Sequence, residues 1–101
     1  MLDRHLYSGL IRLHILHHAA EGPVFGQAMI DELGHHGYKL SAGTLYPILH
    51  GMERQGYLRS QQTMNAGRQR RVYRATPAGR KALVTARQRV QELFGEMFEQ
   101  D

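Results

Sequence analysis

The chain has 101 residues, of which 42% are hydrophobic, a length and composition that fit one folded domain with a modest core. It has no cysteine, which excludes a disulfide framework, a thiolate zinc site and a cysteine nucleophile. No apolar run approaches the roughly 20 residues that span a bilayer, and the first residues do not form a signal peptide. We therefore expect a soluble cytoplasmic protein with no membrane partner.

Basic residues are concentrated in one part of the chain, although the formal net charge is only +4. No Asp or Glu lies between Arg54 and Gln91, and this window, counted from Arg54, holds ten of the thirteen Lys and Arg residues. A basic segment with acidic residues before and after it is typical of a surface that binds a polyanion. A solvated basic face without a partner gives the same pattern, so charge alone leaves both interpretations open.

The first predicted element is a helix over residues 3 to 20 with two apolar stripes. Leu6 and Leu10 belong to one stripe, whereas Ile11 and Ile15 belong to the other. Two stripes indicate that the helix is covered on two sides, by its own domain and by something else. We therefore expect Leu6 and Leu10 to contribute to a dimer interface.

A second, shorter helix is predicted over residues 26 to 36, after a break at Glu21-Gly22-Pro23. Histidines at positions 35 and 36, followed by a glycine, are typical of the C-terminal end of a helix. The residues expected to face the core are Ala28, Met29 and Leu33.

The third predicted helix spans residues 42 to 55, with Ser41 as its N-cap and Thr44 as a second candidate for that role. Pro47 is tolerated because it lies near the N-terminus, where backbone N–H groups lack intrahelical partners. The spacing of apolar residues predicts a core face made of Leu45, Ile48, Leu49 and Met52. The opposite face carries small, polar and aromatic residues: Gly43, Tyr46, Pro47, His50 and Arg54.

Residues 57 to 76 are predicted to form a β-hairpin. One strand runs from 57 to 63, the turn is at Asn65-Ala66-Gly67, and the return strand runs from 70 to 75 with Val72 and Tyr73 on opposite faces. The tip and the return strand hold four arginines: Arg68, Arg70, Arg71 and Arg74.

The last predicted helix runs from about 77 to 99, with Thr76 as its N-cap and Pro77 at its first position. Apolar residues recur along this helix at spacings of three and four and form a seam. Phe94 and Phe98 make the seam wider than one helix of a small domain can bury against itself. We therefore predict a homodimer held by this seam; the alternative is a monomer whose last helix folds back on its own domain. The heptad-like seam contains Leu83, Ala86, Val90, Leu93 and Met97.

Three helices, a basic hairpin and a long terminal helix are, in this order, typical of a winged helix-turn-helix. A helix that reads the major groove exposes small or polar side chains at its N-terminal end, and Pro47 stiffens that end here. The sequence thus predicts a mainly α fold with a small β-hairpin, with a DNA-binding domain over residues 1 to 76 and a C-terminal dimerisation helix over residues 77 to 101. The residues suited to reading DNA are Ser41, Gly43, Thr44, Tyr46 and His50.

Two stretches, LSAGTLYPILHGMERQGYL and GRQRRVYRATPAGRKAL, resemble the PadR family of transcriptional regulators. The family pattern reads Ser-x-Gly-Thr-Leu-Tyr-Pro, then Leu, Glu and Gly, and later Gly-Arg, Tyr, Thr and Gly. The resemblance covers essentially the whole chain and is to the short branch of the family, with a single helix after the wing. The matching positions are Ser41, Gly43, Thr44, Leu45, Tyr46, Pro47, Leu49, Glu53, Gly56, Gly67, Arg68, Tyr73, Thr76 and Gly79.

The resemblance implies a dimeric winged helix-turn-helix protein, usually a repressor, that binds an inverted-repeat operator in double-stranded DNA. It implies a small hydrophobic or aromatic effector, expected at the dimer interface, and no cofactor. Phe25-Gly26-Gln27 and a short wing depart from the family pattern. The resemblance places Ser41, Thr44 and Tyr46 at the DNA, and Arg68 and Arg70 at the backbone or minor groove. We expect Arg71, beside them on the wing, to neutralise phosphate as well.

Seven histidines make a metal-responsive regulator the first alternative. Helical histidines are commonly half-exposed surface residues, cysteine is absent, and Asp31 and Glu32 are the only acids expected nearby, so we predict no metal site. The candidate ligands are His14, His17 and His18 on one helix face, with His35 and His36 approaching from the second helix.

The sequence holds no glycine loop followed by Gly-Lys-Ser, no Ser/His/Asp arrangement at an elbow and no clustered carboxylates. Glu53, the lone acid near the third helix, is expected to pair with a neighbour such as Arg54 or to cap a contact. We therefore predict no enzyme and no catalytic residue. A winged-helix module that binds protein remains an alternative, against which the uninterrupted basic window argues.

Overall fold

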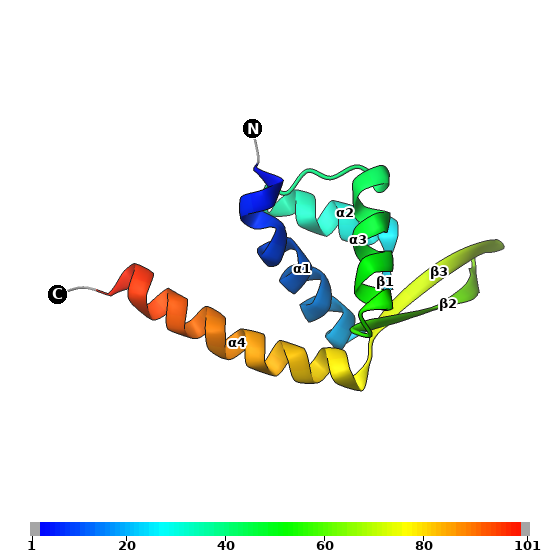
Figure 1. Ribbon diagram of the computed structural model, residues 1–101. Coiled ribbons are helices and arrows are strands. Elements are labelled where there is room, and N and C mark those ends of the chain that lie inside the picture. The colour runs from blue at the N-terminus through cyan, green and yellow to red at the C-terminus, as the bar shows by residue number, and fades with distance from the viewer. Residues whose placement is uncertain (1–2, 100–101) are drawn as a thin grey trace.

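The computed structural model describes residues 3 to 99, so positions 1, 2, 100 and 101 of the two predicted domains lie outside the described residues. Three helices pack together, a hairpin extends from one side of them, and a long last helix leaves from another (Figure 1). This arrangement confirms the predicted fold class. In chain order the elements are α1 (Arg4–Glu21), β1 (Val24–Phe25), α2 (Gly26–His35), α3 (Ala42–Arg54), β2 (Leu58–Asn65), β3 (Arg68–Ala75) and α4 (Pro77–Phe98).

Side-chain caps start two of the helices where the sequence predicts them. The Ser41 hydroxyl accepts a hydrogen bond from the Thr44 amide at the start of α3. The Thr76 hydroxyl accepts one from the Gly79 amide, and Pro77 is the first residue of α4. Each cap satisfies a backbone N–H that has no partner within its own helix.

Pro47 is the sixth residue of α3, deeper than a start at Thr44 would have placed it. A proline there removes the hydrogen bond to the carbonyl of Gly43, four residues earlier. Both residues are exposed, so water can hydrate that carbonyl. The exposed position is what makes the proline tolerable.

The sheet has three antiparallel strands in the order β1-β3-β2, one more than the sequence predicts. The added strand is short: Val24 pairs with Tyr73, and Phe25 pairs with Val72. Between β2 and β3 the chain turns within two residues, Ala66 and Gly67, which both have positive φ. Such a turn matches the twist of the strands and lets them pair up to the tip, so the wing is longer than predicted.

The core lies where α1, α2, α3 and the sheet meet. Its largest fully buried side chains are Tyr73, Ile11, Ile15, Leu33, Leu45, Leu49 and Leu58. The inward prediction for Ala28 is wrong: α2 buries Gly26, Met29 and Leu33, and Ala28 falls outside that face and is exposed. Val72 and Tyr73 are both buried, although alternation along a strand places them on opposite faces.

The last helix is joined to this core only through its first turns. Gly79 is its one buried position among the described residues, because a Cβ there would overlap the Tyr57 carbonyl. Leu83 packs on the core from α4, whereas the rest of the helix runs away from it (Figure 1). Within residues 3 to 99, no helix has the length and apolarity needed to cross a bilayer.

Candidate nucleic-acid interface

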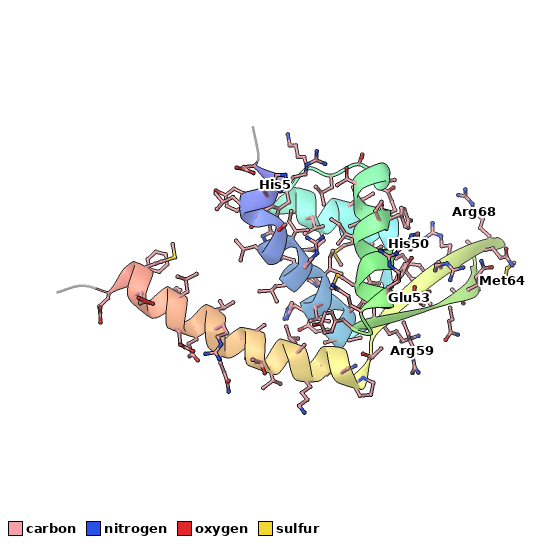
Figure 2. All side chains as sticks on the ribbon, viewed as in Figure 1. His5, His50, Glu53, Arg59, Met64 and Arg68 are labelled. Carbon is pink, nitrogen blue, oxygen red and sulfur yellow. The ribbon has the colours of Figure 1, made fainter. Side chains whose placement is uncertain are left out.

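The N-terminal half of α3 presents the predicted reading face. Ser41, Gly43, Pro47 and His50 are exposed. Figure 2 shows His50 on the side of α3 toward the hairpin, which carries Arg59, Met64 and Arg68. This face therefore lies beside the basic strands, as a winged helix-turn-helix requires for contact with one DNA duplex.

Tyr46 is half-buried, so its predicted position on the exposed face is only partly right. Its ring packs on the core, and its hydroxyl lies where a Cβ on Gly26 would be. Glycine at the start of α2 thus makes room for the tyrosine. The contact joins α2 to the reading end of α3, and it could not be inferred from the spacing within α3.

Thr44 is also half-buried, and its hydroxyl has a partner that the sequence did not indicate. Arg4 Nη1 donates a hydrogen bond to Thr44 Oγ1 at 2.9 Å. Arg4 and Arg12 line a hollow between the start of α1 and α3. Arg4 lies far outside the basic window, so only the tertiary fold brings its charge to the reading face.

The four predicted wing arginines are all exposed, but two of them also make contacts within the chain. The guanidinium of Arg70 lies 5.6 Å from the centre of the Phe25 ring, within the range of a cation–π contact. Arg71 Nη1 donates to Ser60 Oγ at 3.0 Å. These contacts hold the two arginines on the strand while their charge stays accessible to solvent.

Glu53 fastens the wing to α3. Its carboxylate accepts hydrogen bonds from the Ser60 amide at 3.1 Å and from the Ser60 hydroxyl at 2.9 Å. Of the two predicted roles, Glu53 therefore caps a contact rather than pairing with Arg54. Through Ser60 the carboxylate is linked to Arg71, so α3 and the basic strand are connected by one polar chain.

The predicted dimer residues are apolar side chains on α4 and on the first half of α1. The exposed fraction of Leu6 is 70%, that of Phe94 is 61% and that of Met97 is 66%. Leu83 and Ala86 are half-buried, because the first turns of α4 lie against α1. Leu10 on α1 and Val90, Leu93 and Phe98 on α4 are exposed as well.

The histidines predicted to lie together are only partly brought together. His36, rather than His35, faces α1, and its ring stacks on that of His14 with the centroids 4.7 Å apart. Burial lowers the pKa of His14, and the neighbouring His36 and His18 lower it further. Two acids accompany the cluster: Glu32, as predicted, and Glu21, which the sequence did not indicate.

Comparison with known proteins identifies this arrangement. The model of the transcriptional regulator PadR-like family matches residues 15–85. Transcriptional regulator Rv3488 of Mycobacterium tuberculosis is 52% identical over 94 residues, which are 93% of this chain and 88% of that protein.

Solved structures agree with this assignment. A PadR family transcriptional regulator from Eggerthella lenta has a TM-score of 0.73 and 31% identity, covering 96% of this chain and 88% of its own. A PadR-like transcriptional regulator from Bacillus cereus has a TM-score of 0.81 at 22% identity, covering 96% of this chain and 99% of its own, which shows the shared fold. The chain therefore belongs to the PadR-like family of transcriptional regulators.

Proposed function

We propose that the protein is a cytoplasmic repressor that binds, as a homodimer, an inverted-repeat operator in double-stranded DNA. The N-terminal half of α3 enters the major groove, with Ser41, Gly43, Thr44, Tyr46, Pro47 and His50 at or near the bases. Arg68, Arg70 and Arg71 on the wing neutralise the neighbouring backbone or enter the minor groove.

The observation that carries this proposal is the joint surface of α3 and the wing. The exposed start of α3 offers small and polar side chains, which suit close approach to base edges. The arginines of β3 add positive charge beside it, which suits phosphate. The link from Glu53 through Ser60 to Arg71 fixes the two parts relative to each other, so they can meet one duplex together.

A dimer follows from the uncovered seam of α4. In water, exposed Val90, Leu93 and Met97 side chains favour burial against a second apolar surface. A second copy of α4 supplies such a surface, and a two-fold axis then places two α3 helices on half-sites about one DNA turn apart.

An effector bound between the two copies would release the operator. Phe94 and Phe98 lie with their ring centroids 4.7 Å apart on the exposed seam. An aromatic or hydrophobic molecule inserted there would change the angle between the α4 helices. The spacing of the two α3 helices would change with it, and the half-sites could no longer be bound together.

Selection of bound sequences from random double-stranded DNA tests the proposal. The expected result is an inverted repeat with half-sites about one turn apart, bound by two chains per duplex. Enrichment of a single half-site would refute the dimeric mode, and no enrichment would refute sequence-specific binding. In that last case, capture of a protein partner would favour the winged-helix interaction module.

A further inference from the structure

Four side chains capable of binding metal face one another between α1 and α2. His14 and His18 are one turn apart on α1, and Glu32 and His36 are one turn apart on α2. Residues at this spacing share one helix face, so each helix presents two groups toward the other. None of the four belongs to the reading face or the wing.

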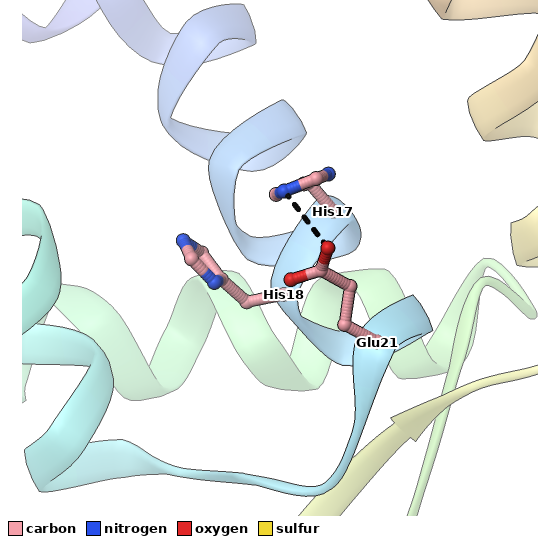
Figure 3. A group of neighbouring side chains, drawn as sticks. All are labelled: His17, His18 and Glu21. Atoms are coloured by element: carbon pink, nitrogen blue, oxygen red, sulfur yellow. Dashed lines mark ion pairs between the residues drawn. The ribbon is translucent and has the colours of Figure 1, made fainter.

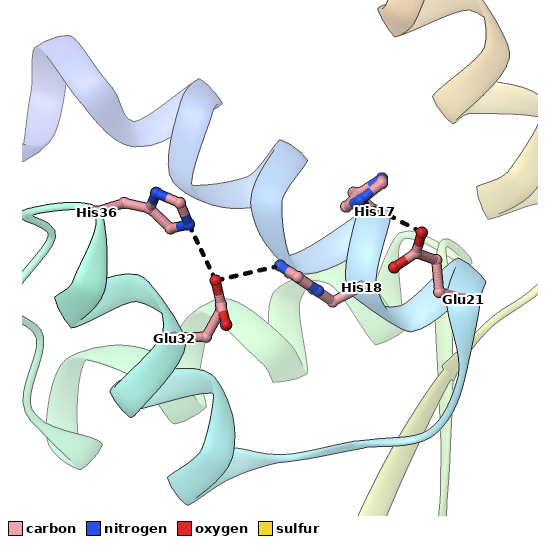
Figure 4. A network of polar contacts seen from close by, with 5 residues as sticks. All are labelled: His17, His18, Glu21, Glu32 and His36. Carbon is pink, nitrogen blue, oxygen red and sulfur yellow. Dashed lines mark hydrogen bonds and ion pairs between the residues drawn. The ribbon is translucent and has the colours of Figure 1, made fainter.

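The carboxylate of Glu32 is the centre of this group. Its Oε2 atom lies 2.9 Å from His36 Nε2 and 3.8 Å from His18 Nε2, so two imidazoles from different helices approach the same oxygen (Figure 4). The ring of His14 stacks against the ring of His36. The side chains of His18, Glu32 and His36 are 30%, 37% and 47% exposed, so the site is only partly sheltered from solvent.

We propose that His18, Glu32 and His36 form a binding site for a divalent transition metal ion with the ligand preferences of Zn²⁺. Imidazole nitrogen and carboxylate oxygen bind zinc at about 2.0–2.2 Å, and two histidines with one glutamate form a known ligand set that leaves a position for water. Ligand atoms around a tetrahedral ion of that size are about 3.3 Å apart. The two distances to Glu32 Oε2 lie on either side of that value.

The ion is bound between the two imidazoles and the carboxylate of Glu32. The side chains of His18 and His36 must rotate to bring both nitrogens onto it, because among the described residues only the group of His17, His18 and Glu21 has all its ligand atoms within 4.8 Å of one another. Because His18 comes from α1 and the other two ligands from α2, the bound ion cross-links the two helices. Metal binding then stabilises the folded chain, since the site does not exist in the unfolded one.

A second group, His17, His18 and Glu21, competes for this assignment (Figure 3). Its potential ligand atoms lie within 4.8 Å of one another. All three come from the last turn of α1, and the side chains of His17 and Glu21 are 52% and 66% exposed. An ion bound there would join residues of one helix turn only, and two of its three ligands are exposed surface side chains, so we assign the site to the pair of helices. His18 is common to both groups and cannot distinguish them.

Titration of the full-length, chelator-treated protein with Co²⁺ and Zn²⁺ tests the proposal. Cobalt reports its ligand geometry through its visible absorption bands, and calorimetry gives the stoichiometry and affinity of zinc. Glu32→Gln and His36→Gln each remove one proposed ligand, whereas His17→Gln and Glu21→Gln alter the competing group. Circular dichroism of each apo variant checks that the fold is retained.

The expected result is one ion per chain and a thermal midpoint raised by zinc. Affinity should fall at least about tenfold in Glu32→Gln and His36→Gln, since loss of an outer partner alone costs about that much. His17→Gln and Glu21→Gln should bind as the unaltered chain does. Loss of affinity in His17→Gln and Glu21→Gln, with affinity retained in the other two variants, would place the site at the end of α1 and overturn the proposal. Absence of binding, or equal binding by all four variants, would also overturn it.

Discussion

At the scale of single residues, Tyr46 lies at the boundary between the core and the reading face. Its ring is packed, while its hydroxyl reaches the start of α2 beside Gly26. Tyr46→Phe keeps the ring and removes only the hydroxyl, which we propose bonds to a base edge. Discrimination between operator and random DNA should fall by about 1–3 kcal/mol, measured by competition binding, with little change in unfolding free energy.

Tyr7→Phe is the matched control, because Tyr7 is also half-buried but lies on α1 and packs against Tyr38. It should leave discrimination unchanged. If Tyr46→Phe instead destabilises the fold and leaves discrimination intact, the hydroxyl serves the contact between α2 and α3, and its proposed role at DNA is wrong.

Tyr73 is fully buried, and its hydroxyl makes no hydrogen bond to any other described residue. A buried hydroxyl without a partner costs folding free energy. Tyr73→Phe should therefore raise the unfolding free energy by about 1 kcal/mol in urea titrations at neutral pH. A loss of stability would show that the hydroxyl is satisfied in solution.

The same residue predicts a difference in alkaline stability. Burial raises the pKa of Tyr73 above its ordinary value, although nearby Arg71 lowers it in part. The folded chain keeps the hydroxyl protonated where the unfolded chain ionises it, near pH 10. The unfolding free energy is therefore unaffected by this ionisation below about pH 10, and it falls as the pH rises from there through the folded pKa of Tyr73. Tyr73→Phe should lose less stability than the unaltered chain over that range.

At the scale of elements, the wing is held to α3 by the hydrogen bonds of Ser60. Ser60→Ala removes the hydroxyl that bridges Glu53 and Arg71. We expect a loss of about 1 kcal/mol and faster amide exchange in β2 and β3. Gln61→Ala changes an exposed neighbour on the same strand and should have neither effect. Equal exchange in the two variants would show that the Ser60 hydroxyl does not fasten the wing.

The charge of the wing predicts a salt effect. Arg70→Ala with Arg71→Ala removes two arginines that we propose neutralise phosphates, so DNA of any sequence should be bound more weakly. The slope of log affinity against log salt should flatten by about 0.9 for each phosphate that is no longer neutralised. Fluorescence anisotropy at several salt concentrations measures this slope.

Two controls separate charge from structure in that experiment. Lys81→Ala with Arg87→Ala removes the same charge from exposed positions on α4 and should leave the slope unchanged. Ser60→Ala disturbs the support of Arg71 without changing the charge, so it should lower affinity at an unchanged slope. An unaltered slope in the Arg70 and Arg71 variant would show that the wing does not touch the DNA backbone.

At the scale of the whole molecule, the chain extends over 57 × 33 × 21 Å because α4 leaves the core. Leu93→Gln with Met97→Gln makes the seam polar without changing charge, far from the core. The variant should sediment as a monomer and lose affinity for the inverted repeat, while binding to a single half-site stays unchanged.

Val84→Gln is the control, since Val84 is 58% exposed on the same helix but lies off the seam. It should remain a dimer. Removing all residues after Ala82 is a poorer test, because Leu83 packs on the core and its loss would destabilise the domain. An unaltered chain that sediments as a monomer at micromolar concentration with full operator binding would contradict the proposed dimer.

The sequence by itself determined the helices, their caps at Ser41 and Thr76, the basic hairpin and the family. Each of these depends on signals within a few residues, such as apolar spacing, a capping hydroxyl, or a proline at the first helical position. The family pattern is likewise read along the chain. The DNA-binding and dimer roles of individual residues stay predictions.

Only the tertiary structure decided which distant residues meet. It paired Val24 with Tyr73, brought Arg4 to Thr44, joined Glu53 to Ser60 and set Glu32 between His18 and His36. The residues of most of these pairs lie many positions apart, and a two-residue strand has no periodicity to detect. Their contacts are fixed by how α1, α2, α3 and the sheet pack around one core, which no local pattern encodes.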